Sequence, residues 1–274
     1  MSIISTGAVI ASGREQSARM PFLLQVSALT WRNLVVVFRT PAELLPSIFI
    51  SIFFVLVYKD LLSGAAAFFL PGQDYLGFVL PISIVSTALN GAGTAGQAVV
   101  RDIESGYFDK LMLTPISRVA IVFGAILSGA IVLMLLTSIV LVTGLLLGLQ
   151  PATGLAGLLT VLGYSLLLGL GFAGFTVGIA LRSGSAGATQ GATFLFFPLT
   201  FLTATFTPFE LLSGWIKTAA QFNPVTYLLE AMRPLLLTGW DTDALLRGFI
   251  TCLGLAVVTF AFAFFSLQAR TKRR

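Results

Sequence analysis

The sequence predicts an all-α polytopic membrane protein with six transmembrane helices, and three observations support this fold class. Of the 274 residues, 57% are hydrophobic and only 10% are charged, whereas soluble domains carry about a quarter charged residues. The mean hydropathy is +0.97. Apolar runs that approach or exceed the roughly 20 residues of a membrane-spanning helix recur between short polar segments. A chain this apolar needs lipid around it.

The amino-terminal part is expected to lie outside the lipid core. In residues 1–20 the arginines follow the apolar patch, the reverse of a secretory signal peptide, so we expect a cytoplasmic tail. In residues 21–40 a polar residue recurs every seven positions and marks one helical face: Gln25, Arg32 and Arg39. This spacing predicts an interfacial helix with its arginines toward the headgroups and Trp31 at the membrane boundary.

Six apolar runs are predicted to cross the bilayer. They cover residues 42–60, 75–100, 119–149, 155–181, 188–207 and 246–267. The first is short for a spanning helix, and Pro198 predicts a kink in the fifth. The glycines of the second and fourth runs are expected to allow close helix packing.

Residues 208–244 are too polar to span the membrane and too apolar for an ordinary loop. Residues 209–220 and 224–237 each show helical periodicity, and Asn223 with Pro224 separates them. We expect two short helices that dip into the outer half of the membrane. Such a re-entrant arrangement needs cover from protein or a water-filled cavity.

Six spans place both termini on one side of the membrane, and the basic residues indicate which side. If the termini and the loops at 101–118 and 182–187 face the cytoplasm, only four of the 16 lysines and arginines remain outside: Lys59, Lys217, Arg233 and Arg247. Cytoplasmic segments of membrane proteins are enriched in these residues. We therefore expect both termini in the cytoplasm.

Several kinds of catalytic site are absent from the sequence. It has no histidine, the commonest general base near neutral pH and a common metal ligand. Cys252 lies in an apolar run and is expected to pack as a small hydrophobic residue. None of the four lysines follows a glycine, so the GxxxxGKS/T phosphate-binding loop is missing. We expect no enzyme, no metal site and no cofactor on this chain; if ATP drives the protein, a separate chain binds it.

A short charged segment, residues 101–118, interrupts the apolar sequence. Its charges are ordered with acids mostly before bases, which suits a helix dipole: Asp102, Glu104, Asp109, Lys110 and Arg118. Its apolar residues repeat at roughly helical spacing: Phe108, Leu111 and Met112. We expect a short amphipathic helix, interrupted at Gly106 and ended by Pro115, that docks on another protein. A solvated connector is the alternative, since charge runs are usually hydrated surface.

This charged segment resembles the cytoplasmic coupling segment of type-2 ABC exporter permeases. The family pattern is an acid, a glycine, an acid-base-leucine step and a Pro-x-Ser-Arg end, found here as Glu104, Gly106, Asp109-Lys110-Leu111 and Pro115-Ile116-Ser117-Arg118. PFELLSGW (208–215) and FNPVTYLLEAMR (222–233) are similar to the segment before that family's last span. The likeness covers nearly the whole chain and is closest to the antibiotic-exporter branch, typified by daunorubicin-resistance permeases. Tyr107 stands where that family usually has threonine or a similar residue.

The resemblance implies the membrane-spanning subunit of an exporter in the bacterial inner membrane, acting on an amphipathic drug-like or lipid-like substrate. It implies a second permease copy and two copies of an ATPase subunit that would hold ATP and Mg²⁺. The residues implied to couple to the ATPase are Asp102, Glu104, Gly106, Tyr107, Phe108, Asp109, Leu111, Pro115 and Arg118. The alternatives are a glycan or lipid-linked polysaccharide exporter of the same family and a non-transporting scaffold.

Two predicted spans carry polar stripes. One comprises Ser83, Asn90, Thr94, Gln97 and Arg101, and the other Thr189, Thr193, Thr200, Thr203 and Thr207 with Phe196 among them. Polar groups that face lipid are costly, so both stripes should point inward, either to line a pathway or to bond helices together. For the threonine stripe the family resemblance favours a dimer seam.

The segment 208–244 contains four charged residues that are candidates for an outer gate: Glu210, Lys217, Glu230 and Arg233. Glu230 and Arg233 are three residues apart and could pair on a helix. A solvated outer rim is the alternative to a gate.

Overall fold

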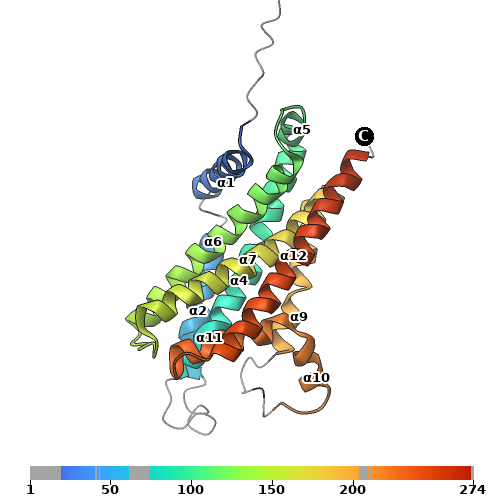
Figure 1. The fold of residues 1–274 in the computed structure, drawn as a ribbon. Helices are drawn as coiled ribbons and strands as arrows, with labels where there is room; N and C mark the ends of the chain where they lie inside the picture. The colour runs from blue at the N-terminus through green and yellow to red at the C-terminus, as the bar shows by residue number, and fades with distance from the viewer. Residues whose placement is uncertain are drawn as a thin grey trace, which may run out of the picture.

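The computed structural model describes residues 20–40, 42, 44–61, 75–203, 209 and 212–272. All the regular structure within these ranges is helical, in agreement with the predicted class, and Figure 1 shows long helices bundled together with short helices at both ends. In chain order the helices are α1 (Phe22–Arg39), α2 (Leu45–Leu61), α4 (Tyr75–Glu104), α5 (Tyr107–Met112), α6 (Arg118–Leu146), α7 (Gly154–Ser183), α8 (Ala186–Phe194), α9 (Phe197–Phe201), α10 (Gly214–Phe222), α11 (Pro224–Leu237) and α12 (Thr242–Lys272).

Four of the described helices are long and apolar enough to cross a membrane: α4, α6, α7 and α12. They correspond to the second, third, fourth and sixth predicted runs. α7 is the hub, because the other three all pack against it. The apolar stretch of α2, Leu45–Val57, is shorter than these, as its sequence suggests.

The fifth predicted run does not form the single kinked helix expected from its sequence. Within its described part, the chain forms α8 and α9 with a break between them. Pro198 accounts for the break, because proline has no N–H to donate four residues back and its ring crowds that carbonyl. Tighter turns fill the gap, from Phe196 N to Thr193 O (3.1 Å) and from Leu199 N to Phe196 O (3.0 Å).

Glycines on α7 allow the close packing that the sequence predicts. A Cβ at Gly169 would lie 2.8 Å from the Cα of Ala130 on α6, and one at Gly174 would lie 2.7 Å from the Oγ1 of Thr259 on α12. Real Cβ atoms do not approach so closely. α7 therefore contacts two neighbouring helices at distances that only glycine permits.

α10 and α11 form the two short helices predicted in residues 208–244, and the chain breaks at Asn223 as expected. The Asn223 amide is 2% exposed and joins three backbone groups. Its Nδ2 donates to Leu199 O (2.6 Å) and Leu202 O (2.8 Å), and its Oδ1 accepts from Val225 N (3.0 Å). One side chain thus caps α11 and fixes it to the end of α9.

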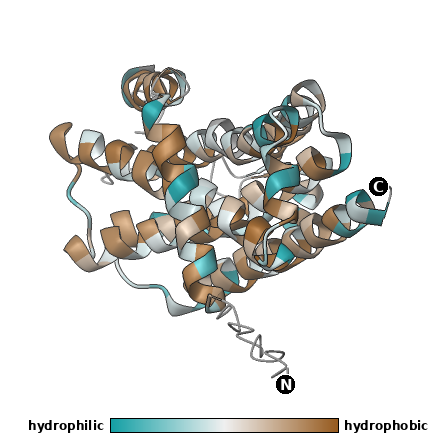
Figure 2. Ribbon diagram, turned by 90° about the horizontal axis from the view of Figure 1, so that it is seen from above, coloured by the Kyte–Doolittle hydropathy of each residue, from teal (hydrophilic) through white to brown (hydrophobic). Residues whose placement is uncertain are grey.

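The bundle has two distinct ends. α5 and the carboxyl terminus of α12 lie at one end, with α1 beside it, while α10, α11 and the turn between α6 and α7 lie at the other (Figure 1). That turn is bonded to α11, since Ala152 N donates to Leu236 O (3.1 Å) and Thr153 N donates to Leu235 O (3.3 Å). Figure 2 shows that hydrophobic residues dominate the long helices between the two ends.

α1 is a separate helix, as the sequence predicts, and the structure shows that it packs along α6. A Cβ at Gly124 of α6 would lie 2.8 Å from the Cβ of Leu29, so the two helices approach closely. On its other side, Leu23 and Trp31 are 78% and 69% exposed. All of the predicted tail (1–20) except Met20 lies outside the described residues, as do the predicted site residues Thr207 and Glu210.

Candidate functional site

The charged segment, residues 101–118, begins as an extension of α4 and turns back at Gly106. α4 continues to Glu104, and Gly106 has φ +71°, a left-handed conformation that glycine adopts without a steric penalty. A Cβ here would meet nothing within 4 Å. The glycine is therefore needed for the direction of the chain rather than for space, and it turns the backbone into α5.

The apolar face of α5 packs within this chain, which corrects the sequence interpretation. Phe108 and Leu111 are 4% and 7% exposed and belong to a cluster with Val26 of α1 and Ile121 of α6. The sequence assigned this face to a partner protein. The amphipathic pattern is real, but other helices of the same chain, including α1, α4 and α6, supply the apolar cover.

The exposed surface of the segment is its tip and its charged edge. Leu113, just after α5, is 88% exposed, and the other exposed residues are Glu104, Ser105, Lys110, Thr114, Pro115 and Arg118. Of the remaining candidates, Asp102, Tyr107 and Asp109 are half-buried. A partner protein would meet these exposed groups first.

A charged pair joins α1 to the root of the segment. Arg32 binds the Asp102 carboxylate with its two terminal guanidinium nitrogens, Nη1 at 2.5 Å and Nη2 at 2.6 Å. The Arg32 guanidinium also lies over the Tyr107 ring, 4.1 Å from its centroid. The hydrogen bonds that Arg32 donates to the Asp102 carboxylate raise the pKa of Arg32 above its ordinary value. We call Arg32, Asp102 and Tyr107 the arginine clamp.

The arginine clamp corrects one prediction and explains one departure. Arg32 was expected to face lipid headgroups, but it faces Asp102 instead. Tyr107, the residue that differs from the family pattern, supplies the aromatic face on which Arg32 rests. An arginine above an aromatic ring is a favourable electrostatic arrangement.

Two further contacts hold the ends of the segment. Gln25 of α1 accepts a hydrogen bond from Ser117 N through its Oε1 (2.8 Å), immediately before α6 begins. On the other side, Arg270 of α12 donates to Leu181 O at the end of α7 (3.1 Å) and lies 5.9 Å from the Phe108 ring centroid. The segment is thus braced by α1 and α12, far away in the sequence.

The polar stripe of α4 faces its neighbours within the chain. Ser83 is fully buried, Thr94 donates to Gly91 O (2.7 Å), and Gln97 donates to Ala186 O at the start of α8 (3.1 Å). The side chain of Asn90 lies outside the described part of the structure. In its described part, this stripe includes a contact between helices, Gln97 to α8.

The threonine stripe of α8 and α9 also faces inward. A Cβ at Gly96 of α4 would lie 2.5 Å from Thr189 Cγ2, and one at Gly93 would lie 3.3 Å from Thr193 Oγ1. The other described residues of the stripe are buried as well: Phe196, Thr200 and Thr203. Thr203 shares a hydrogen bond of 2.6 Å with Thr226 of α11. Large apolar side chains occupy the outer face instead: Phe194, Leu195, Phe197 and Phe201, all at least 55% exposed.

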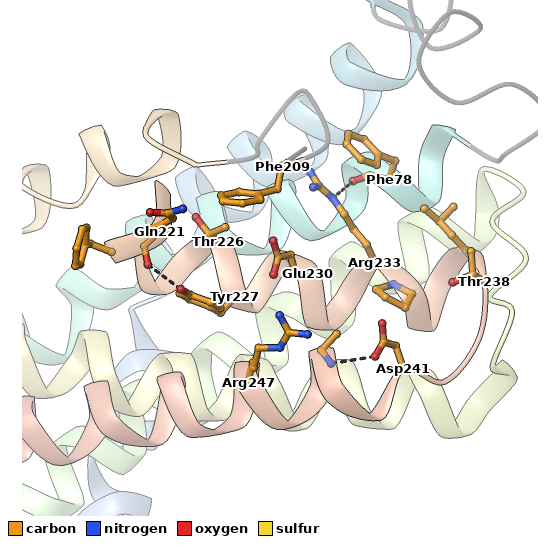
Figure 3. A pocket seen from close by; sticks show the side chains of 14 residues that line it. Phe78, Phe209, Gln221, Thr226, Tyr227, Glu230, Arg233, Thr238, Asp241 and Arg247 are labelled. Carbon is orange, nitrogen blue, oxygen red and sulfur yellow. Dashed lines mark hydrogen bonds between the residues drawn. The ribbon is translucent and has the colours of Figure 1, made fainter. Parts of the chain in front are cut away.

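A cavity of about 850 Å³ lies at the opposite end of the bundle, between α11 and α12 (Figure 3). We call it the α11–α12 cavity. α10, the start of α4 and Phe209 contribute to its wall. Its lining mixes aromatic rings with charged groups: Phe78, Phe209, Phe222, Tyr227, Glu230, Arg233, Asp241 and Arg247.

The structure places two of the four predicted gate residues on the wall of this cavity. Glu230 and Arg233 both line it. Arg233 is 8% exposed, and its guanidinium lies 3.7 Å from the Phe78 ring centroid while its Nε donates to Phe78 O (3.4 Å). Lys217 lies 5.7 Å from the ring centroid of Phe209, another lining residue.

Sequence reasoning missed the partners of these residues. Arg32 was seen as a headgroup contact, Arg247 only as a basic residue on the outer side, and Phe78 as part of an apolar span. Tyr227 lies three positions before Glu230 and therefore on the same helical face, a signal that could have found it. The others come from helices distant in sequence, and no local pattern connects them.

Comparison with known proteins identifies the family. The sequence model of the ABC-2 type transporter family matches residues 24–237, well over half of the chain. The chain belongs to the ABC-2 type transporter family. The match begins in α1 and ends with α11, so this ABC-2 transporter carries the arginine clamp and Glu230 inside the matched region, while α12 with Arg247 lies beyond it.

Individual relatives of this ABC-2 transporter cover most of its length. A daunorubicin resistance ABC transporter permease protein of Streptomyces coeruleorubidus is 22% identical over 83% of this chain and 80% of its own. A probable doxorubicin resistance ABC transporter permease protein of Mycobacterium tuberculosis is 24% identical over 90% of this chain and 88% of its own. A putative transport permease of Porphyra purpurea is 24% identical over 76% of this chain.

Proposed function

We propose that this ABC-2 transporter is the membrane-spanning subunit of an exporter that moves an amphipathic drug-like or lipid-like molecule out of a bacterial cytoplasm or inner leaflet. ATP and Mg²⁺ would be held by a separate ATPase subunit, present in two copies. Family membership supports the transport role, and the names of the daunorubicin and doxorubicin resistance permeases support the substrate class.

The proposal that an ATPase docks on this chain is supported mainly by the tip of the charged segment, which is exposed and braced by other helices. The tip exposes Leu113, Pro115 and Glu104. Beneath it, Phe108 and Leu111 are buried, and the arginine clamp ties the root to α1. A partner that pushes on the tip would therefore move α4, α6 and α1 together, because each is packed or hydrogen-bonded to the segment. Nucleotide-dependent contact at the tip would bias the equilibrium between two transporter conformations.

The outer face of α8 and α9 supports a second permease copy. Phe194, Leu195, Phe197 and Phe201 project away from α4, whereas the threonine stripe packs toward it. We place the dimer seam and the transport route along this apolar outer face rather than along the threonines. The family resemblance assigns this part of the chain to the seam.

The orientation in the membrane follows from charge. Among the described residues, most lysines and arginines lie at the end of the bundle that holds the charged segment and the carboxyl-terminal end of α12, and the positive-inside rule would put that end in the cytoplasm. α1 would then lie along the cytoplasmic interface with Trp31 toward lipid, and the α11–α12 cavity would open in the outer half of the membrane.

The test is coupled transport with a charge-reversed tip. The chain is co-expressed with an ABC ATPase, and ATP-dependent uptake of a fluorescent amphipathic dye into inverted vesicles is measured. Glu104→Lys should leave membrane insertion intact and abolish both uptake and stimulated ATP hydrolysis. Asp243→Lys, a reversal at an exposed acid at the other end of the bundle, serves as the control. Full uptake by Glu104→Lys would refute docking at this tip.

A further inference from the structure

The long helices α6, α7 and α12 carry positive charges at one end of the bundle without acids of their own to balance them. The sequence contains no aspartate or glutamate between Lys110 and Phe209, a range that includes all of α6 and α7. The single acid of α12 is Asp243 in its first turn, whereas Arg270 and Lys272 lie in its last turn. At the end that holds the charged segment (Figure 1), these three helices therefore contribute basic side chains and no acidic ones.

A contact between α6 and α12 brings two of these cations to the same place. Arg118, the first residue of α6, donates from Nη1 to Thr271 Oγ1 of α12 (3.5 Å), and Lys272 is the next residue. Further along the two helices, the Phe123 ring of α6 meets the Phe260 ring of α12 edge to face, with 5.5 Å between the ring centroids. Arg118 and Lys272 therefore mark the end of one pair of contacting helices.

Both cations are available to an anion. Arg118 and Lys272 are exposed, and neither has an acidic partner among the described residues. In the adjoining charged segment, Asp102 is bound in the arginine clamp and Asp109 has an interaction of its own within the chain. Glu104 is the exposed acid of that segment. One exposed acid does not neutralise two exposed cations, so this end of α6 and α12 attracts negative charge.

The length of α12 places its terminal cations at the level of lipid headgroups. α12 has 31 residues, and at 1.5 Å per residue it is about 46 Å long, close to the roughly 40–45 Å of a bilayer that includes its headgroups. Its outer face is apolar up to that level, since Val258 and Phe265 are 67% and 63% exposed. These two residues and Lys272 are spaced seven apart and so share one helical face. An exposed apolar stripe that ends in a cation matches the shape of a phospholipid.

We propose that an anionic phospholipid binds at this end of α6 and α12, with its headgroup at Arg118 and Lys272 and an acyl chain along Phe265 and Val258. Basic residues between membrane helices bind such headgroups. A zwitterionic headgroup fits less well, because Arg118 and Lys272 repel its ammonium group. An acidic surface of an ATPase would meet the same two cations, but it would make no use of the apolar stripe beside them. The site requires no ATPase and does not rest on the proposed export function.

The test compares two phospholipids with identical dioleoyl chains, phosphatidylglycerol and phosphatidylcholine. The full chain is purified in a non-ionic maltoside without an ATPase, and the binding of each lipid is measured by native mass spectrometry. Wild type should bind phosphatidylglycerol more tightly than phosphatidylcholine. Arg118→Gln and Lys272→Gln should each weaken phosphatidylglycerol binding about fivefold, the effect of removing one basic residue at the membrane surface. Both variants should bind phosphatidylcholine as wild type does.

Arg247→Gln is the matched control, because it removes the same charge from an exposed position of α12 near the opposite end of that helix. It should bind both lipids as wild type does. Wild type that does not prefer phosphatidylglycerol would overturn the proposal. An equal loss in all three variants would also overturn it, since net charge rather than a site would then attract the lipid. The wild-type comparison needs no variant, so it decides the matter even if a variant folds poorly.

Two further measurements separate the lipid from an ATPase contact. Phe265→Ala should weaken both lipids alike, because the two share their acyl chains. The Arg118→Gln and Lys272→Gln variants are also co-purified with an ABC ATPase. Full lipid binding by these variants together with loss of the ATPase would show that the cations contact the ATPase, and the lipid site would be refuted.

Discussion

Arg32 ties α1 to the charged segment through two hydrogen bonds and one aromatic ring. Its side chain is 32% exposed and that of Asp102 is 18% exposed, so solvent screens the pair only in part. Partly exposed ion pairs usually contribute up to about 1 kcal/mol. The bidentate geometry places this pair at the upper part of that range.

A double-mutant cycle measures this interaction. Arg32→Gln, Asp102→Asn and the double variant should show a coupling of about 1 kcal/mol in unfolding free energy, because either single change removes the same contact. Thermal unfolding in detergent gives the values, with Glu104→Gln as an exposed control. Additive single effects would show that the clamp does not stabilise the fold.

Asn223 is a second residue whose role appears only in three dimensions. Asn223→Asp keeps an acceptor for Val225 N but loses both hydrogens that now go to Leu199 O and Leu202 O. Each buried carbonyl left without a donor costs about 1–3 kcal/mol. We expect a clear drop in the melting temperature. Gln221→Glu makes the same chemical change at an exposed neighbour and should have little effect.

At the scale of elements, α5 has two faces with separable roles. The inner face, with Phe108, supports the fold, and the tip at Leu113 is available to a partner. Phe108→Ala should destabilise the protein by about 3–5 kcal/mol, because it leaves a cavity in a buried cluster. Leu113→Asp should leave the melting temperature unchanged and abolish stimulation of a co-expressed ATPase. Equal effects of both changes on stability would contradict this division.

The break between α8 and α9 shows how a proline can affect an apolar run. A proline in an apolar run predicts a kink, but here it divides the run, and tighter turns from Phe196 N to Thr193 O and from Leu199 N to Phe196 O satisfy the backbone at the break. Whether a proline bends or divides a helix depends on whether other groups satisfy the backbone nearby.

The whole molecule presents a charged end and a cavity end, and cysteine labelling tests which side each faces. The native Cys252 is fully buried and should not react with the labelling reagent. Single cysteines are placed at Leu113 and at Trp240, which is 57% exposed between α11 and α12. A membrane-impermeant maleimide should label the cysteine at 240 in intact spheroplasts and the one at 113 only in inverted vesicles. The reverse pattern would overturn the assigned orientation.

Local sequence determined much of the architecture. The length of the apolar runs alone located α4, α6, α7 and α12. A helix in lipid satisfies its own backbone hydrogen bonds, and it needs a minimum number of apolar residues to cross the hydrocarbon core. Helix breakers located the junction of α10 and α11, and glycine positions anticipated the close contacts of α7. The sequence also predicted the charged segment and its short helix, because the spacing of residues within one or two turns shows which of them share a helical face.

The tertiary structure decided which surface each side chain faces. The amphipathic pattern of α5 showed that one face is covered, but not that helices of the same chain cover it. The threonine stripe was visible in the sequence, but its contact with the glycines of α4 could not be predicted from it. Arg32 with Asp102 and Arg233 with Phe78 come from different helices. Periodicity describes a helix by itself, whereas pairing between helices depends on packing that brings distant residues together.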